Sequence, residues 1–450
     1  MEPSHPGAAE RVDPSEHDRS PYAQVIPPSL VRLPIYFFAI GVLSLAGAGI
    51  AAPAVMPAAV RFFFQPTVLA LVHTLTLGVI TAVMMGVMYR YVPALVHRPI
   101  RFPRLAYPQL ALFAVGAIGM IAHFAIGEWG GLWWSAAVVL LSIVGFALCL
   151  LPILWPELGK GVAETGMFLS ICYLLCAATL GLLMGLGETY GFVWTGLLRM
   201  LDAHVAFAAI GWVTLTICAA SYRFIPAFVL PTAKLPRAAL WQIWALALSV
   251  AGLGTTLLFG GAGAALWGAA AGLSLIAYLL VLLHLIRSRR LKIDWGLRHA
   301  QAGAAWLVVT IALGVAAAWN GGWPGDGAAL TGALGAAALL GWIINFIIGM
   351  SSQLFPGFVS RVRFARDWPA VTIAELSVPR VHRFVFALYN IGVGLIVAAF
   401  LLASPRLALC GSFPLAAGTS LYACATIWGL SFAYRKSLPA SARNPLRVLG

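Results

Sequence analysis

The sequence predicts an all-α integral membrane protein with twelve transmembrane helices, arranged as three four-helix units that are related by rotation. Of its 450 residues, 61% are hydrophobic and only 9% are charged, whereas a soluble domain carries about a quarter charged residues. Apolar runs of about 20 residues, each long enough to cross a bilayer, recur along the whole chain. The runs are continuous rather than alternating, so they predict helices and not the strands of a barrel.

The predicted spans follow one another with short connections. A polar, proline-bearing segment precedes them, so residues 1–32 are expected to form a disordered cytoplasmic tail and residues 33–450 a single membrane domain. Several spans exceed what a bilayer requires, which predicts tilted helices. The predicted spans are 34–56, 63–92, 106–127, 132–154, 165–187, 200–229, 238–259, 263–286, 300–319, 328–356, 382–403 and 408–433.

Lys and Arg residues gather on one side of these spans. If the N-terminus lies on the inner side, only Arg61, Arg199 and Arg406 among the 28 Lys and Arg residues fall on the outer side. This is the positive-inside distribution, and it predicts that both termini are cytoplasmic. The net charge of +14 therefore reflects topology in a lipid bilayer, and it does not predict nucleic-acid binding.

The ends of three predicted helices share a pattern. The second ends in Tyr-Arg-Tyr-Val-Pro (89–93), the sixth in Tyr-Arg-Phe-Ile-Pro (222–226) and the tenth in Ser-Gln-Leu-Phe-Pro (352–356). The prolines, which are expected to mark helix exits, are 133 and 130 residues apart, and each interval holds four helices. Because four is even, the units share one orientation, with a rotation axis along the membrane normal. The units are expected at about 33–157, 158–290 and 291–436.

Three histidines, His73, His123 and His204, lie in the outer parts of predicted spans. An ionisable residue within a span is costly and marks a functional site by default. Neutral imidazoles at one depth are suited to bind haem iron or copper. An alternative stays open for two of them, because Glu128 is near His123 in sequence and Asp202 is near His204. His73 lies deeper, with no charged residue near it in sequence.

Four further histidines lie at the inner ends of predicted helices. Imidazoles at such positions are expected to face water or lipid headgroups. These residues are His97, His284, His299 and His382.

The second predicted helix also carries a recognisable motif. It contains the pair His73-Thr74 and closes with a Gly-x-x-Tyr-x-x-x-Pro pattern from Gly86 to Pro93. Together with twelve helices in three rotated units, this motif resembles subunit I of the haem–copper oxidase superfamily, in particular its nitric oxide reductase-like branch. The resemblance implies that His73 is an axial ligand of a low-spin haem b, in a protein of the bacterial inner (cytoplasmic) membrane.

The other metal ligands of that family are incomplete in this chain. The family's tenth and seventh helices each supply two histidines, whereas residues 328–356 and 238–259 contain none. His204 matches the copper ligand on the sixth helix, but Ala208 stands where the family has Tyr or Glu. A complete oxygen or nitric oxide reductase is therefore not expected, and no catalytic residue is assigned. The second haem ligand is left open between His123, His204 and a methionine.

The resemblance thus implies a membrane haem protein that transfers electrons or binds nitric oxide, with copper as a further candidate metal at His73 or His204. A cytochrome c or another electron-transfer subunit is the implied partner. Two other functions stay open. A cofactor-free scaffold or assembly partner is favoured by the histidines missing from the tenth helix. A transporter is less well supported, because the repeats are parallel and no charge pair lies at mid-membrane.

Overall fold

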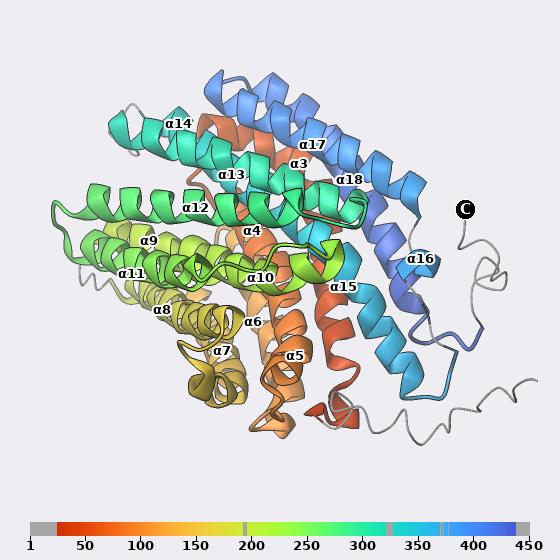
Figure 1. Ribbon diagram of the computed structural model, residues 1–450. Helices are drawn as coiled ribbons and strands as arrows, with labels where there is room; N and C mark the ends of the chain where they lie inside the picture. Colours follow the sequence, from red (N-terminus) through yellow and green to blue (C-terminus); the bar gives the residue numbers. More distant parts are fainter. Residues whose placement is uncertain are drawn as a thin grey trace, which may run out of the picture.

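The computed structural model describes residues 25–191, 196–320, 327–369, 371, 373–376 and 378–437 (Figure 1). Within this part, all regular secondary structure is helical, and twelve helices are long and apolar enough to cross a membrane. The elements are η1 (Pro28–Leu30), α3 (Leu33–Arg61), α4 (Pro66–His73), η2 (Thr74–Thr81), α5 (Ala82–Val96), η3 (Pro103–Leu105), α6 (Ala106–Ile126), α7 (Leu132–Leu154), η4 (Trp155–Glu157), α8 (Val162–Tyr190), α9 (Leu197–Val205), η5 (Ala206–Thr214), α10 (Leu215–Val229), α11 (Ala238–Phe259), α12 (Ala264–Arg287), α13 (Trp295–Trp319), α14 (Ala328–Ala336), η6 (Ala337–Ile344), α15 (Asn345–Phe364), α16 (Ile373–Leu376), α17 (Pro379–Leu401) and α18 (Pro405–Ser431).

The twelve predicted spans are confirmed, with changes at their ends. The prolines that were expected to mark helix exits lie inside helices instead. The second and sixth spans continue to Val96 and Val229, and the tenth passes Pro356 and ends at Phe364. In the tenth span, Pro356 interrupts one backbone hydrogen bond. The helix after it still packs against its neighbours, because Phe358 and Val359 are buried.

The predicted tail, residues 1–32, falls in two parts. Residues 1–24 lie outside the described residues. Residues 25–32 pack on the bundle, because they supply the buried apolar side chains of Val25, Ile26, Leu30 and Val31. The ordered chain therefore begins before the first predicted span.

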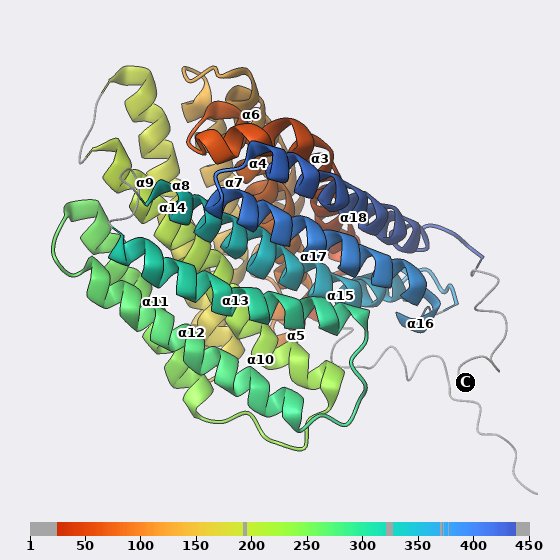
Figure 2. The ribbon, with the colours of Figure 1, turned by 90° about the horizontal axis from the view of Figure 1, so that it is seen from above.

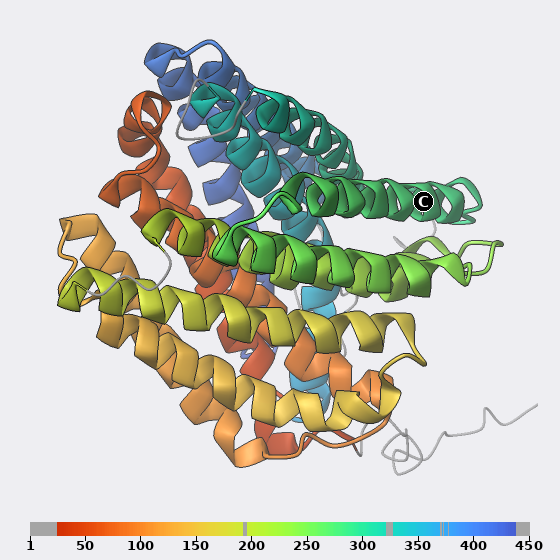
Figure 3. The ribbon, with the colours of Figure 1, turned by 90° about the vertical axis from the view of Figure 1, so that its left-hand side faces the viewer.

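The helices run side by side, tilted with respect to one another (Figure 3). The chain closes on itself, since α18 packs along both α3 and α17 (Figure 2). The second, sixth and tenth spans are the most enclosed, with two thirds or more of their most apolar stretch buried. We call the end of the bundle that carries the connections after α5, α7, α10, α12 and α15 the basic end, because most Lys and Arg side chains lie there.

Each of these three enclosed spans contains a π-helical segment: η2, η5 and η6. Such segments are rare and are usually a single turn. Each one carries a glycine against a neighbouring helix. A Cβ atom at Gly78, Gly211 or Gly341 would lie 2.5–2.7 Å from the side chain of Ser44, Tyr173 or Trp306 respectively. The glycines therefore permit the close approach of the first, fifth and ninth spans.

Two hydrogen-bonded triads have the same composition and the same connections. In the first, Tyr89 Oη donates to Gln109 Oε1 (3.2 Å), and Gln109 Nε2 donates to Ser142 Oγ (2.9 Å). In the second, the corresponding distances are 2.9 Å from Tyr222 to Gln242 and 3.2 Å from Gln242 to Ser274. Both triads join a tyrosine near the end of one helix to the next two helices of the chain, so polar groups in apolar surroundings are satisfied in the same way twice.

Candidate functional site

His73 is the last residue of α4, and η2 begins at the next position. Its Nδ1 donates a hydrogen bond to the carbonyl oxygen of Leu69, 2.8 Å away and one turn earlier. Its ring stacks on Phe124 of α6, with 4.6 Å between the ring centroids. The side chain is half-buried. Because a carbonyl only accepts, the proton is fixed on Nδ1, and the Nε2 lone pair is left for a ligand.

His204 repeats this arrangement on α9, two residues before η5. Its Nδ1 donates to the carbonyl oxygen of Ala177 on α8, again over 2.8 Å. The ring lies over Gly181, where a Cβ atom would be 3.4 Å from Cε1. His204 is therefore oriented by α8 and not by Asp202, the partner that the sequence had left open.

The imidazoles of His73 and His204 share one orientation. Both have Nδ1 bonded to a backbone carbonyl and Nε2 unbonded within the described part of the chain. This is the orientation that metal-ligating histidines adopt, where the bond at one ring nitrogen fixes the other toward the metal.

His123 has a different environment. Its Nδ1 lies 2.7 Å from Glu128 Oε2, and its ring packs edge-on against Trp134 with 5.6 Å between centroids. Glu128 Oε2 also accepts from the backbone N–H of Gly131 at 3.0 Å. His123, in the last turn of α6, is thus paired with Glu128 just after the helix, which is the alternative partner expected from the sequence.

The donors present fit some metal centres better than others. Among the described residues, no group of three or more His, Cys, Asp or Glu side chains is placed to hold a metal ion. A structural zinc site takes four protein ligands, so it does not fit. A haem iron takes four ligands from its porphyrin and needs one or two from the protein, so two oriented imidazoles suffice. Imidazole also suits copper.

Trp212 of η5 links the second and sixth spans. Its Nε1 donates to Thr81 Oγ1 of η2 at 3.1 Å, which joins the two π-helical segments. Trp212 is 1% exposed, as is Trp342 of η6, and its ring packs on Phe146. Sequence reasoning missed this tryptophan pair, although both lie 130 residues apart in the middle of long apolar runs.

A second polar group lies in the last four spans, toward the basic end. His299 and His382 were predicted to face water or headgroups, and this prediction was wrong: they are 1% and 8% exposed. His299 Nδ1 donates to Asn345 Oδ1 at 2.8 Å, and Asn345 Nδ2 donates to Asn390 Oδ1 at 3.0 Å. The helix α13 starts at Trp295 and not at the predicted residue 300, because Asp294 caps it, and His299 therefore lies one turn inside the helix.

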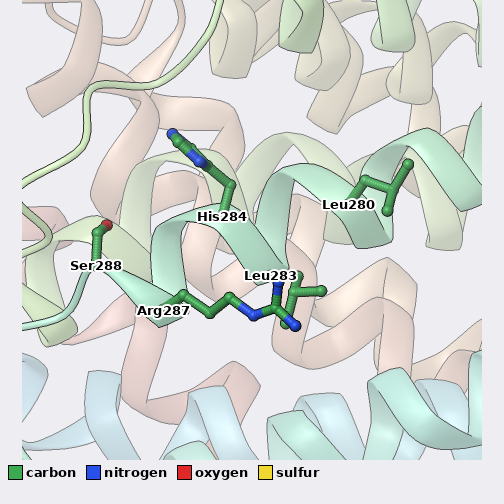
Figure 4. A pocket seen from close by; sticks show the side chains of 5 residues that line it. All are labelled: Leu280, Leu283, His284, Arg287 and Ser288. Atoms are coloured by element: carbon green, nitrogen blue, oxygen red, sulfur yellow. The ribbon is translucent and has the colours of Figure 1, made fainter.

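A more open hollow lies at the basic end of α12 (Figure 4). Its volume is about 380 Å³, and Figure 4 shows its lining of two leucines, an imidazole, a guanidinium and a hydroxyl, all from one helix end. Apolar stems with cationic heads at this level suit contact with acyl chains and lipid headgroups. The lining residues are Leu280, Leu283, His284, Arg287 and Ser288.

No protein-family model matches the sequence, and no curated protein matches it. The function proposed below therefore stands on the residues and their geometry.

Proposed function

We propose that this chain is a multi-pass membrane haem protein with a fold of the haem–copper oxidase type, and that His73 and His204 hold its metal centre. The observation that carries the proposal is the shared geometry of the two rings. Each donates from Nδ1 to a backbone carbonyl over 2.8 Å and presents Nε2. A burial this costly inside a span is expected where the imidazole has a function.

The repeated contacts support the oxidase-type architecture. The three π-helical segments, the glycines within them and the two Tyr-Gln-Ser triads recur at intervals of 130 to 133 residues. Such recurrence is expected if three four-helix units are related by rotation about an axis along the membrane normal. With the basic end inside, both termini are cytoplasmic, as in a protein of the bacterial inner membrane.

Haem b is the metal centre that we favour, with His73 as one axial ligand and His204 as the second ligand or as a ligand to copper. Bound haem would supply one-electron transfer or an iron that takes a diatomic gas. Ala208 provides no proton donor beside His204. We therefore propose electron transfer or nitric oxide binding rather than reduction of oxygen or nitric oxide, with a cytochrome c or another electron-transfer subunit as the redox partner.

A cofactor-free scaffold or assembly partner is the second candidate. The specific observation in its favour is that aromatic side chains pack around the buried tryptophans of the sixth and tenth spans. Trp212 and Trp342 occupy buried positions in η5 and η6, with Phe146 and Tyr278 packed against them. On this alternative, the histidines serve packing, and no metal is bound.

The absorption spectrum of the purified, detergent-solubilised protein decides between the two. We expect a Soret band in the wild type, its loss in His73→Ala, and a changed band position or copper content in His204→Ala. His284→Ala is the matched control, since that imidazole is exposed and lies at the basic end. Added imidazole should restore the band in His73→Gly. A wild type that carries neither haem nor copper, by spectroscopy and metal analysis, refutes the proposal and favours the scaffold.

A further inference from the structure

The last four spans contain a cavity of about 80 Å³ at the basic end, between α13, α15, α16 and α17. A water molecule occupies about 30 Å³ in the liquid, so the cavity has room for two or three. Its polar lining consists of Asp294, Ser352, Gln353 and His382, and the rest is formed by Trp295, Gly296, Phe355, Pro356, Leu376 and Pro379.

The cavity lies where the two earlier units hold a tyrosine bonded to a glutamine. Tyr89 and Tyr222 are four residues before Pro93 and Pro226, and the residue four before Pro356 is Ser352. The glutamine partners of these tyrosines are the fourth residue of α6 and the fifth of α11, and the fourth residue of α17 is His382. Replacing a tyrosine by serine removes an aromatic ring, which opens the cavity.

The hydrogen bonding differs in the same way. In the two earlier units, each glutamine side chain is bonded to both of its partners. In the third, His382 Nδ1 and His299 Nε2 are buried without a hydrogen-bond partner among the described residues. An unsatisfied buried polar group costs about 1–3 kcal/mol. His382 lines the adjoining cavity, and water there would satisfy its Nδ1, because the site is both polar and roomy enough.

The charges around the cavity favour a proton over a metal ion. Asp294 is exposed at the mouth, where its carboxylate accepts from the backbone N–H of Leu297 (2.9 Å) and from Gln353 Nε2. Asp294 and His382 both line the cavity, and His382 is the more buried of the two. One carboxylate and one imidazole supply proton acceptors but too few oxygen ligands for a hard cation.

The other charged side chains of the surrounding helices do not line the cavity. Arg298 of α13 is exposed and lies over the Trp295 ring, 4.4 Å from its centroid. Arg380 and Arg383 of α17 are also exposed. Glu375 of α16 interacts with Arg363. These cations oppose the double charge of a divalent metal ion more strongly than the single charge of an imidazolium.

We propose that the third unit holds a proton-binding site, in which water in this cavity connects Asp294 at the mouth with the imidazole of His382. Binding converts a neutral imidazole and a proton into an imidazolium, and release returns the proton through the same water. The site uses none of the residues assigned to the metal centre, so either proposal stands if the other fails.

Nitrogen NMR of the full chain, labelled with ¹⁵N-histidine and reconstituted in lipid bilayers, tests the proposal. The signals of His382 are assigned by their loss in His382→Gln. We expect this ring to contact water and to become an imidazolium between pH 8 and pH 5. Asp294→Asn keeps the shape and removes the negative charge that favours the imidazolium, so protonation should then require a pH lower by about 1 unit or more.

Filling the cavity provides the second test. Ser352→Tyr restores the ring of the earlier units and should abolish the contact between water and His382. The double variant Ser352→Tyr with His382→Gln rebuilds a Tyr-Gln pair and should fold, which separates loss of water from loss of structure. His284→Gln is the control and should leave the His382 signals unchanged. A His382 ring that stays neutral down to pH 5, or whose protonation is the same in Asp294→Asn, overturns the proposal.

Discussion

The close crossing of α13 and α15 predicts how a substitution at Gly349 changes the stability of the protein. A Cβ atom at Gly349 would lie 2.5 Å from the carbonyl oxygen of Gly296 and 2.9 Å from the backbone nitrogen of Ala300. Ordinary contacts begin at 3.4 Å, so Gly349→Ala requires the helices to separate by about 0.9 Å. The obstructing atoms are backbone, which cannot rotate away as a side chain would.

Two opposing effects set the size of the change. Alanine is about 1 kcal/mol better than glycine inside a helix. Overpacking costs about 1–3 kcal/mol, and the rigid neighbours of Gly349 place it at the upper end. We therefore expect Gly349→Ala to lower the free energy of unfolding by about 2 kcal/mol.

Gly335 of α14 is the matched control, because it lies in the same span and a Cβ atom there has nothing within 4 Å. Gly335→Ala should raise stability by about 1 kcal/mol, which leaves a gap of about 3 kcal/mol between the two variants. Unfolding of the detergent-solubilised protein, followed by SDS titration and by thermal scanning, measures both. Equal stability of the two variants would refute the description of this helix crossing.

Four further substitutions test other contacts by the same unfolding assay. Arg363→Gln should cost about 2–4 kcal/mol, because the buried guanidinium donates to the carbonyl oxygens of Pro369, Phe432 and Arg435, and its removal should also free the C-terminal segment to proteolysis. Gln109→Leu and Gln242→Leu should each cost about 1–3 kcal/mol, and their effects should add, since the two triads share no partner; a double variant no less stable than either single one would contradict this. Trp212→Phe should cost about 1 kcal/mol or more from the lost bond to Thr81, and a stability unchanged from the wild type would count against that bond.

The number and order of the spans could be predicted from the sequence, because hydropathy and the demand for internal backbone hydrogen bonds decide them. The spacing of Pro93, Pro226 and Pro356 also indicated corresponding positions in the chain. The π-helical segments could not be predicted in this way. They depend on contacts between spans, such as the bond from Trp212 to Thr81, and no local pattern marks them.

The candidate site was predictable in part. His73 and His204 stood out because ionisable residues are rare in spans, but their orienting partners, the carbonyls of Leu69 and Ala177, carry no side-chain signal. The burial of His299 was missed because the ninth span was expected to begin at residue 300. Asp294 accepts from the N–H of Leu297 and starts the helix at Trp295, and this N-cap was a readable signal.

The π-helical segments have a consequence for engineering the chain. A π-helical turn takes up about one residue more than an α-helical turn, so deleting one residue within η2 could restore α-helical geometry and leave the two ends of the span in phase. Forcing η2 into α-helical geometry without a deletion would instead rotate one end against the other by about 100°. His73 would then turn away from Phe124 while Tyr89 kept its place beside Gln109. The π-helical turns thus set how the two ends of each enclosed span are rotated about the helix axis relative to each other, independently of the length of the span.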